Sequence, residues 1–127
     1  MTLTEECILA LGDDTGIFLD EEKKQIEKNL FQNIRLTSWG EFDWNNIDSR
    51  KIIKNTKIID IKKYVNTIKY YIIWDDPSEP ILLAPLDNII KNIDDVTAVS
   101  TNTWLMSEDK KYFVEIYHET RITIAIF

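Results

Sequence analysis

The sequence holds little of the residues on which metal and nucleophilic sites depend. It has one cysteine, one histidine and three glycines in 127 residues. One cysteine excludes an internal disulfide, and together with one histidine it excludes a structural zinc site. Three glycines leave almost no material for a loop that cradles phosphate. The longest apolar runs are far shorter than the roughly 20 residues that cross a bilayer.

The N-terminal residues include acids at the positions where a secretory signal would carry basic residues. The first residues, Met1-Thr2-Leu3-Thr4-Glu5-Glu6, contain two glutamates in place of the Lys or Arg that opens a secretory signal. The lone Cys7 is typical of a reducing compartment. We therefore expect a soluble cytoplasmic protein that does not contact the membrane. Its length and its 44% hydrophobic content predict a single domain over residues 1–127.

Net charge separates the classes of partner. The chain has 22 acidic and 15 basic residues, a formal charge of −7. This balance argues against direct nucleic-acid binding, which needs a basic surface, and suits a basic protein partner. Residues 50–69 are the exception, with seven bases and one acid. We expect these bases to pair with the acidic flanks; the alternative is a patch for an anionic ligand or partner.

The N-terminal half favours helices. Thr2 and Glu5 form a capping-box pattern before a first helix that ends near Gly12. Asp20 can cap a second helix over 21–32, after a short extended piece at 17–19. Residues 33–49 are irregular and rich in aromatics, and 58–65 form a weaker helical pattern.

The C-terminal half favours strands. We predict strands over 70–74, 81–84, 96–106, 112–118 and 121–127, with a short helix from Pro85 that ends at Asp94-Asp95. Helices followed by strands imply an α+β fold. The predicted architecture is an antiparallel sheet, a C-terminal meander, with helices packed on one face.

No residue set forms a convincing catalytic constellation. His118 is the only imidazole, and Cys7 lies more than a hundred residues away in an apolar stripe, where it reads as a core residue. Three acidic pairs are interpreted first as solvated turn residues and second as an acidic interface: Asp75-Asp76, Asp94-Asp95 and Glu108-Asp109. A small carboxylate and metal hydrolase built on Glu115, His118 and Glu119 is kept as an alternative.

Four tryptophans are a high load for this length. Trp74 and Trp104 fall in strand patterns and are expected in the core. Trp39 and Trp44 lie in irregular chain, where they either cap the core or anchor an interface. Capping is the favoured interpretation of these two side chains.

The C-terminal part carries a family resemblance. The motifs are Ile93-Asp94-Asp95-Val96, then Trp104, then Ser107-Glu108-Asp109, then Glu115-Ile116-Tyr117-His118-Glu119. Within residues 70–127 they resemble small bacterial immunity proteins of contact-dependent growth inhibition and other polymorphic toxin systems. The SMI1/KNR4-like superfamily is a second resemblance, but its early Leu-Pro and its Gly-Gly turn are missing here.

The first resemblance implies a toxin inhibitor without catalysis or cofactor. Such a protein binds the toxic C-terminal domain of a cognate effector, commonly a nuclease, and acts as a monomer in the favoured reading. An oligomerising structural domain is the third class of function that we keep open. The residues expected to bind the toxin are six acids and one aromatic: Asp75, Asp76, Asp94, Asp95, Glu115, Glu119 and Tyr117.

Overall fold

One antiparallel sheet organises the chain. The computed structural model describes residues 1–117 and 121–127. In these residues seven strands pair in the order β1-β4-β3-β5-β6-β7-β2, all antiparallel. The strands are β1 (Gly16–Phe18), β2 (Lys51–Thr56), β3 (Lys69–Trp74), β4 (Ile81–Pro85), β5 (Asn102–Ser107), β6 (Tyr112–Tyr117) and β7 (Arg121–Ile126).

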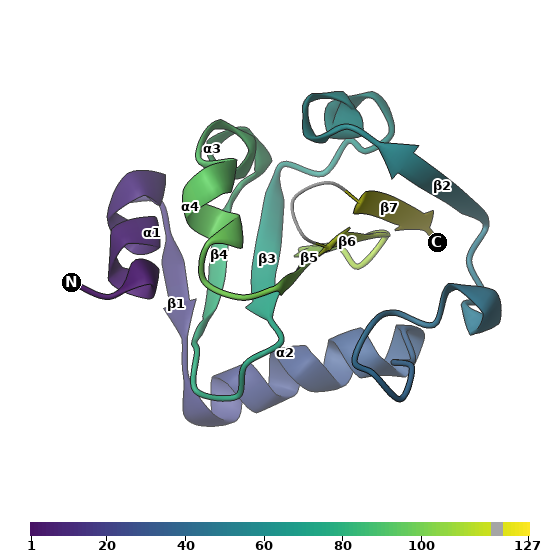
Figure 1. The fold of residues 1–127 in the computed structure, drawn as a ribbon, viewed down its shortest axis with the longest axis horizontal. Helices are drawn as coiled ribbons and strands as arrows, with labels where there is room; N and C mark the ends of the chain where they lie inside the picture. The colour runs from purple at the N-terminus through teal and green to yellow at the C-terminus, as the bar shows by residue number, and fades with distance from the viewer. Residues whose placement is uncertain (118–120) are drawn as a thin grey trace.

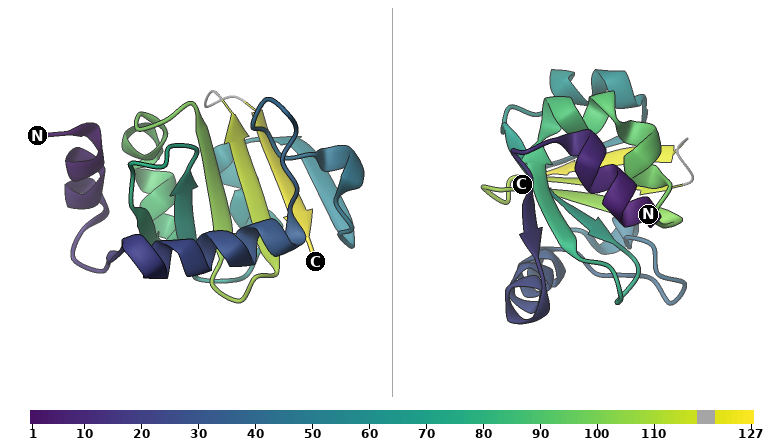
Figure 2. Two further views of the ribbon diagram at one scale, coloured as in Figure 1. Left: turned by 90° about the horizontal axis from the view of Figure 1, so that it is seen from below. Right: turned by 90° about the vertical axis from the view of Figure 1, so that its left-hand side faces the viewer.

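Helices cover both faces of this sheet (Figure 1). They are α1 (Leu3–Leu11), α2 (Asp20–Asn33), α3 (Leu86–Lys91) and α4 (Ile93–Thr97), with 3-10 turns η1 (Trp44–Asn46) and η2 (Ile58–Lys63). The short helices α1, α3 and α4 lie on one side with η2, while α2 runs across the strands on the other side (Figures 1 and 2). The predicted α+β class with an antiparallel sheet is confirmed. The covering of only one face was wrong, because α2 buries Ile26 and Leu30 against the opposite face.

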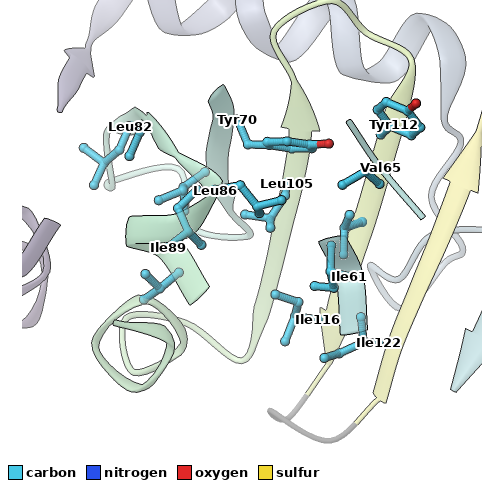
Figure 3. Packing of buried hydrophobic residues seen from close by; sticks show 14 of the residues in the cluster. Ile61, Val65, Tyr70, Leu82, Leu86, Ile89, Leu105, Tyr112, Ile116 and Ile122 are labelled. Carbon is cyan, nitrogen blue, oxygen red and sulfur yellow. The ribbon is translucent and has the colours of Figure 1, made fainter. Parts of the chain in front are cut away.

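The core on the α1, α3 and α4 side is aliphatic. Figure 3 shows side chains from the strands meeting those of η2 and α3. Cys7 and Leu11 of α1 and Val96 of α4 complete this cluster. Because these helices have only 5 to 9 residues, their stability comes from this packing rather than from helix propensity. The residues drawn and labelled are Ile61, Val65, Tyr70, Leu82, Leu86, Ile89, Leu105, Tyr112, Ile116 and Ile122.

The core on the α2 side is aromatic. Phe42 and the Trp104 ring stack with centroids 5.3 Å apart, and Phe31 of α2 meets Trp104 edge-on at 6.3 Å. Trp44 is half-buried against Phe42, with centroids 5.6 Å apart. Phe42 and Trp44 belong to the irregular segment between α2 and β2 and pack on this core. The expectation that Trp39 and Trp44 cap the core is therefore confirmed for Trp44 and wrong for Trp39, which is 72% exposed.

The caps of the first two helices differ. The capping box of Thr2 and Glu5 is present, and α1 ends at Gly12 with φ of 91°, a left-handed conformation that glycine adopts at little cost. The predicted Asp20 cap was wrong, since Leu19 occupies the N-cap and no side chain bonds there. Asp20, Glu21 and Glu22 instead place charge in the first turn of α2, where the helix dipole favours acids.

The predicted long strand over 96–106 was half wrong. Its first part is α4, and Asp94 and Asp95 begin this helix rather than ending the one before. Acids in a first turn are stabilised by the dipole, and the Trp74 Nε1 donates to the Val96 carbonyl at 2.9 Å. Trp74 thus fixes α4 over the sheet, which the β-branched pattern alone does not convey.

Two elements of the middle segment also differ from expectation. The predicted helix over 58–65 is the 3-10 turn η2, and the strand β2 was not predicted. β2 is an edge strand that pairs only with β7 among the described strands. Its register shifts between Ile53 and Thr56, and Asn55 has φ of 57°. Such a bulge weakens the alternating pattern by which strands are read from sequence.

The C-terminal meander is confirmed as β5, β6 and β7. The antiparallel register fixes which residues share one end of the sheet. Trp74 is opposite Thr103, Asn102 is opposite Tyr117, and Tyr117 is opposite Arg121. β3 and β6 therefore end where β5 and β7 begin, and this end of the sheet carries the candidate site.

Candidate functional site

The segment between α2 and β2 folds over that end of the sheet. Residues 36–43, here called the Trp39 loop, are closed by a bridge between Leu36 and Phe42. The Asn102 amide Nδ2 donates to the Gly40 carbonyl at 3.2 Å. A side-chain atom on Gly40 would lie 3.0 Å from Asp75 Oδ2. The loop, the start of β5 and the end of β3 are thus in direct contact.

Glu115 holds the base of the Trp39 loop from inside. This residue of β6 is 6% exposed. Its Oε2 accepts from the Phe42 backbone N–H at 2.7 Å and from Trp104 Nε1 at 3.1 Å. Its Oε1 accepts from Trp44 Nε1 at 2.9 Å. One carboxylate therefore satisfies three N–H donors. Two of them, from Phe42 and Trp44, are 73 and 71 residues away in the chain, and the third, from Trp104, lies on the neighbouring strand.

Burial raises the pKa of the Glu115 carboxyl above its ordinary value, and the three N–H donors act in the opposite direction. Hydrogen bonds to a carboxylate favour its charged form, whereas loss of water disfavours it. The nearby Glu41 carboxylate adds to the upward shift. Because both oxygens are already used by the chain, Glu115 is an internal anchor. Its side chain therefore offers little surface to a partner, and its predicted role in toxin binding stays a prediction.

The tip of the Trp39 loop is ordered by its own hydrogen bonds. The Thr37 N–H donates to the Glu41 carbonyl at 2.7 Å, and the Gly40 N–H donates to the Thr37 carbonyl at 3.1 Å. Gly40 has φ of 86°, a value that a side chain would strain. At the apex the Trp39 indole is 72% exposed, and its Nε1 donates to Glu41 Oε2 at 2.8 Å.

Two carboxylates lie close to this apex, Glu41 on the indole and Asp75 beside Gly40. Together with Asp76, which follows Asp75, and Tyr117, which shares a recess with Glu41, we call them the acidic rim. Asp75 is exposed, and Asp76 accepts from the Ser78 hydroxyl at 2.7 Å and from its N–H at 3.0 Å. These two bonds hold the pKa of the Asp76 carboxyl below its usual value. Asp76 thus stays charged through the ordinary pH range and shapes the turn between β3 and β4.

Tyr117 joins the rim from β6. It lines a recess of about 80 Å³ with Glu41, Trp44, Glu115, Arg121 and Thr123. The Arg121 guanidinium lies 4.8 Å from the centroid of the Tyr117 ring, a cation–π distance. Tyr117 is half-buried, so part of the ring is accessible to a partner. Glu119 and His118 lie outside the described residues.

The second acidic pair belongs to another layer. Asp94 and Asp95 are exposed on α4, which packs with α1 on the face opposite to Phe42 and Trp104. The structure therefore brings together Asp75, Asp76 and Tyr117, and it places Asp94 and Asp95 elsewhere. Burial raises the pKa of the Cys7 thiol to about 12, and the charge of Asp95 contributes to this shift. Cys7 is fully buried, as its apolar surroundings in the sequence indicated.

A comparison with models of protein families matches residues 1–125 to the family described as CdiI immunity protein EcoliA0-like. The chain belongs to this family of CdiI immunity proteins. The match confirms the resemblance drawn from residues 70–127 and extends it over residues 1–69, which that resemblance did not cover. A search among curated proteins found no match.

Membership in this family supports an immunity role for the chain. Among the described residues no group of three His, Cys, Asp or Glu side chains could hold a metal ion. The hydrolase alternative needed Glu115, whose oxygens are committed to N–H donors, together with His118 and Glu119 outside the described range.

No helix in the described parts of the immunity protein is long and apolar enough to span a membrane.

The basic segment of the immunity protein is partly neutralised. Lys62 pairs with Asp87 at 2.5 Å, Lys63 with Asp60 at 3.0 Å, and Lys69 with Asp14 at 3.2 Å. The pairs with Asp87 and Asp14 support the expectation that the basic middle contacts acidic flanks, while Asp60 belongs to the basic segment itself. The remaining bases of the segment are exposed along β2 and its ends: Arg50, Lys51, Lys54 and Lys57.

Glu41 was not predicted as a site residue of the immunity protein, and for Trp39 an interface anchor was only the alternative to capping the core. The signal is the alternation Trp39-Gly40-Glu41-Phe42-Asp43-Trp44. Phe42 and Trp44 turn inward to Glu115, while Gly40 marks the tight turn that leaves Trp39 and Glu41 at the apex. The two tryptophans treated as one pair in the sequence therefore have different environments.

Proposed function

We propose that the chain exercises its immunity role by binding the toxic C-terminal domain of a cognate effector and blocking it, without catalysis of its own. Membership in the CdiI immunity family supports this role. The observation that carries the binding surface is the acidic rim next to a loop that Glu115 fastens. A surface that is already ordered loses little conformational entropy when a partner binds.

The toxin that fits this surface is a basic nuclease. A nuclease holds phosphate with Lys and Arg, so its substrate groove attracts a protein with a formal charge of −7. Carboxylates at the rim can pair with the same cations that would hold the nucleic acid. The inhibitor then occupies the groove and excludes the substrate. Action in the cytoplasm follows from this proposal, because nucleic-acid targets are found there.

Of the residues predicted to bind the toxin, those of the acidic rim are favoured over the acidic pair on α4. Asp75 lies beside Gly40 and Tyr117 lines a recess with Glu41, so both lie next to the ordered loop that carries the exposed Trp39. Asp76 follows Asp75 in the chain. Asp94 and Asp95 lie on a five-residue helix without an exposed aromatic neighbour in that helix. Because interfaces gain most of their energy from buried aromatic anchors, we place the toxin on the rim.

Co-expression tests the proposal. The tagged chain is expressed with the toxic domain encoded directly upstream of it, and the mixture is fractionated by size exclusion at about 150 mM salt. We expect growth to be rescued and a complex of one chain per toxin domain, since we propose a monomeric single domain. Free chain together with continued toxicity would overturn the proposal. A metal-dependent gain in thermal stability would favour the hydrolase instead.

A further inference from the structure

Trp39 is the most exposed aromatic side chain of the described residues. Its exposed fraction is 72%, against 41% for Phe31 and 39% for Tyr64. The neighbouring tryptophan of the same segment, Trp44, is half-buried and bonded to Glu115. Tryptophan is enriched among the residues that anchor protein interfaces, so an exposed and ordered Trp39 is a candidate anchor.

The exposure of Trp39 is not that of a loose tail. The Glu41 N–H donates to the Thr37 hydroxyl at 3.2 Å, in addition to the two backbone bonds that close the tip. The indole itself is oriented by its hydrogen bond to Glu41. Each of these contacts restricts the side chain before a partner arrives. A restricted aromatic ring loses little rotamer freedom on binding.

The foundation of the loop is equally constrained. Three residues after Trp39 the chain enters the aromatic core at Phe42, whose N–H is held by Glu115. Between them, the Gly40 carbonyl next to Trp39 is held by Asn102. Glu115 is thus a positioning residue for Trp39, since it fixes the loop that presents the indole without lying at the surface.

Charge around Trp39 selects the chemistry of the partner. Glu41 contacts the ring directly, and Asp75 lies next to Gly40. The face of an indole attracts cations, and the two carboxylates add to that attraction. We propose that Trp39 is the aromatic anchor of the toxin interface and that it packs against Lys or Arg side chains lining the substrate groove of the toxin. This inference rests on the proposed function.

One other exposed apolar side chain, Ile59, has different surroundings from those of Trp39. Ile59 is also 72% exposed, but it lies on η2 beside Lys62 and Lys63 and on the other face of the sheet. Lys62 and Lys63 pair with Asp87 and Asp60, so this surface lacks the excess of carboxylates that surrounds Trp39. Ile59 is therefore a matched control for Trp39, with equal exposure on the opposite face of the sheet.

The test compares Trp39→Ala, Trp39→Phe and Ile59→Ala by calorimetric titration with the toxic domain encoded directly upstream. We expect Trp39→Ala to weaken Kd at least about 30-fold, equivalent to about 2 kcal/mol. Trp39→Phe keeps a ring but loses the N–H to Glu41, and we expect an intermediate loss. Ile59→Ala should change Kd less than about 2-fold, and the melting temperatures of all three should match the wild type.

The outcomes separate the two proposals. If the wild type binds and Trp39→Ala binds equally well, the anchor is wrong while the proposed function stands. If Ile59→Ala weakens binding as much as Trp39→Ala, the rim is not the interface and the anchor is again wrong. If the wild type does not bind the toxic domain, the proposed function fails. Should Trp39→Ala be unfolded, Trp39→Phe decides: unchanged Kd overturns the anchor.

Discussion

Trp104 and Glu115 are opposite residues in the register of β5 and β6, and the indole Nε1 of Trp104 donates to Glu115 Oε2 at 3.1 Å. This cross-strand pair is the platform on which the Trp39 loop is built. Phe42 stacks on the Trp104 ring while its N–H reaches the same carboxylate oxygen. The exposed rim is thereby tied to the centre of the sheet.

Replacing the buried carboxylate is expected to destabilise the fold. In Glu115→Gln one oxygen becomes an NH₂ that faces an N–H donor, either Trp44 Nε1 or the pair Phe42 N–H and Trp104 Nε1. A buried donor left without an acceptor costs about 1–3 kcal/mol. Urea unfolding at pH 7 measures the change. The exposed Glu108→Gln is the control and should alter the free energy of unfolding by less than about 0.5 kcal/mol.

The difference in the free energy of unfolding between the wild type and Glu115→Gln should decrease as the pH rises. The pKa of Glu115 is raised in the fold, mainly by burial. Its contribution to stability is therefore fully present below the unfolded pKa of about 4.5 and declines as the pH rises through the higher folded pKa. The stability gap between wild type and Glu115→Gln should narrow between pH 4 and pH 8, as unfolding titrations at several pH values would measure. A stability difference that grows as the pH rises would contradict the raised pKa of Glu115.

Two double substitutions of equal charge distinguish the acidic pairs. Asp75→Asn with Asp76→Asn removes two charges from the rim, and Asp94→Asn with Asp95→Asn removes two from α4. We expect the first to slow association with the toxic domain about 10-fold at low salt, because rim charges act mainly on the association rate. The second should change it less than about 3-fold. Stopped-flow association rates decide, and the reverse order would place the toxin on α4.

Much of the fold follows from local sequence signals. The Thr2 and Glu5 capping box, the strand β3 before its Pro-containing turn, and the meander of β5 to β7 are each set by residues close in the chain. α4 and β2 were missed because they depend on residues that are distant in the chain. The carbonyl of Val96 in α4 is held by Trp74, and β2 is paired with β7.

The candidate site was less predictable. Alternation along β6 places Glu115 on the same face as Phe113 and opposite to Val114. Because helices and loops cover both faces, a polar position in β6 is not a surface position. The partners that make burial of Glu115 possible are Phe42 and Trp44, which are 73 and 71 residues away. No local pattern in β6 reveals these partners, and the exposed Trp39 becomes evident only once they are known.

Amide hydrogen exchange of the chain, free and saturated with the toxic domain, tests the central claim most directly. The account predicts slowed exchange on binding in residues 37–43 and 75–76, with residues 51–63 and α4 unchanged. Slowing confined to α4, or to β2 and η2, would contradict the acidic rim as the surface that neutralises the toxin.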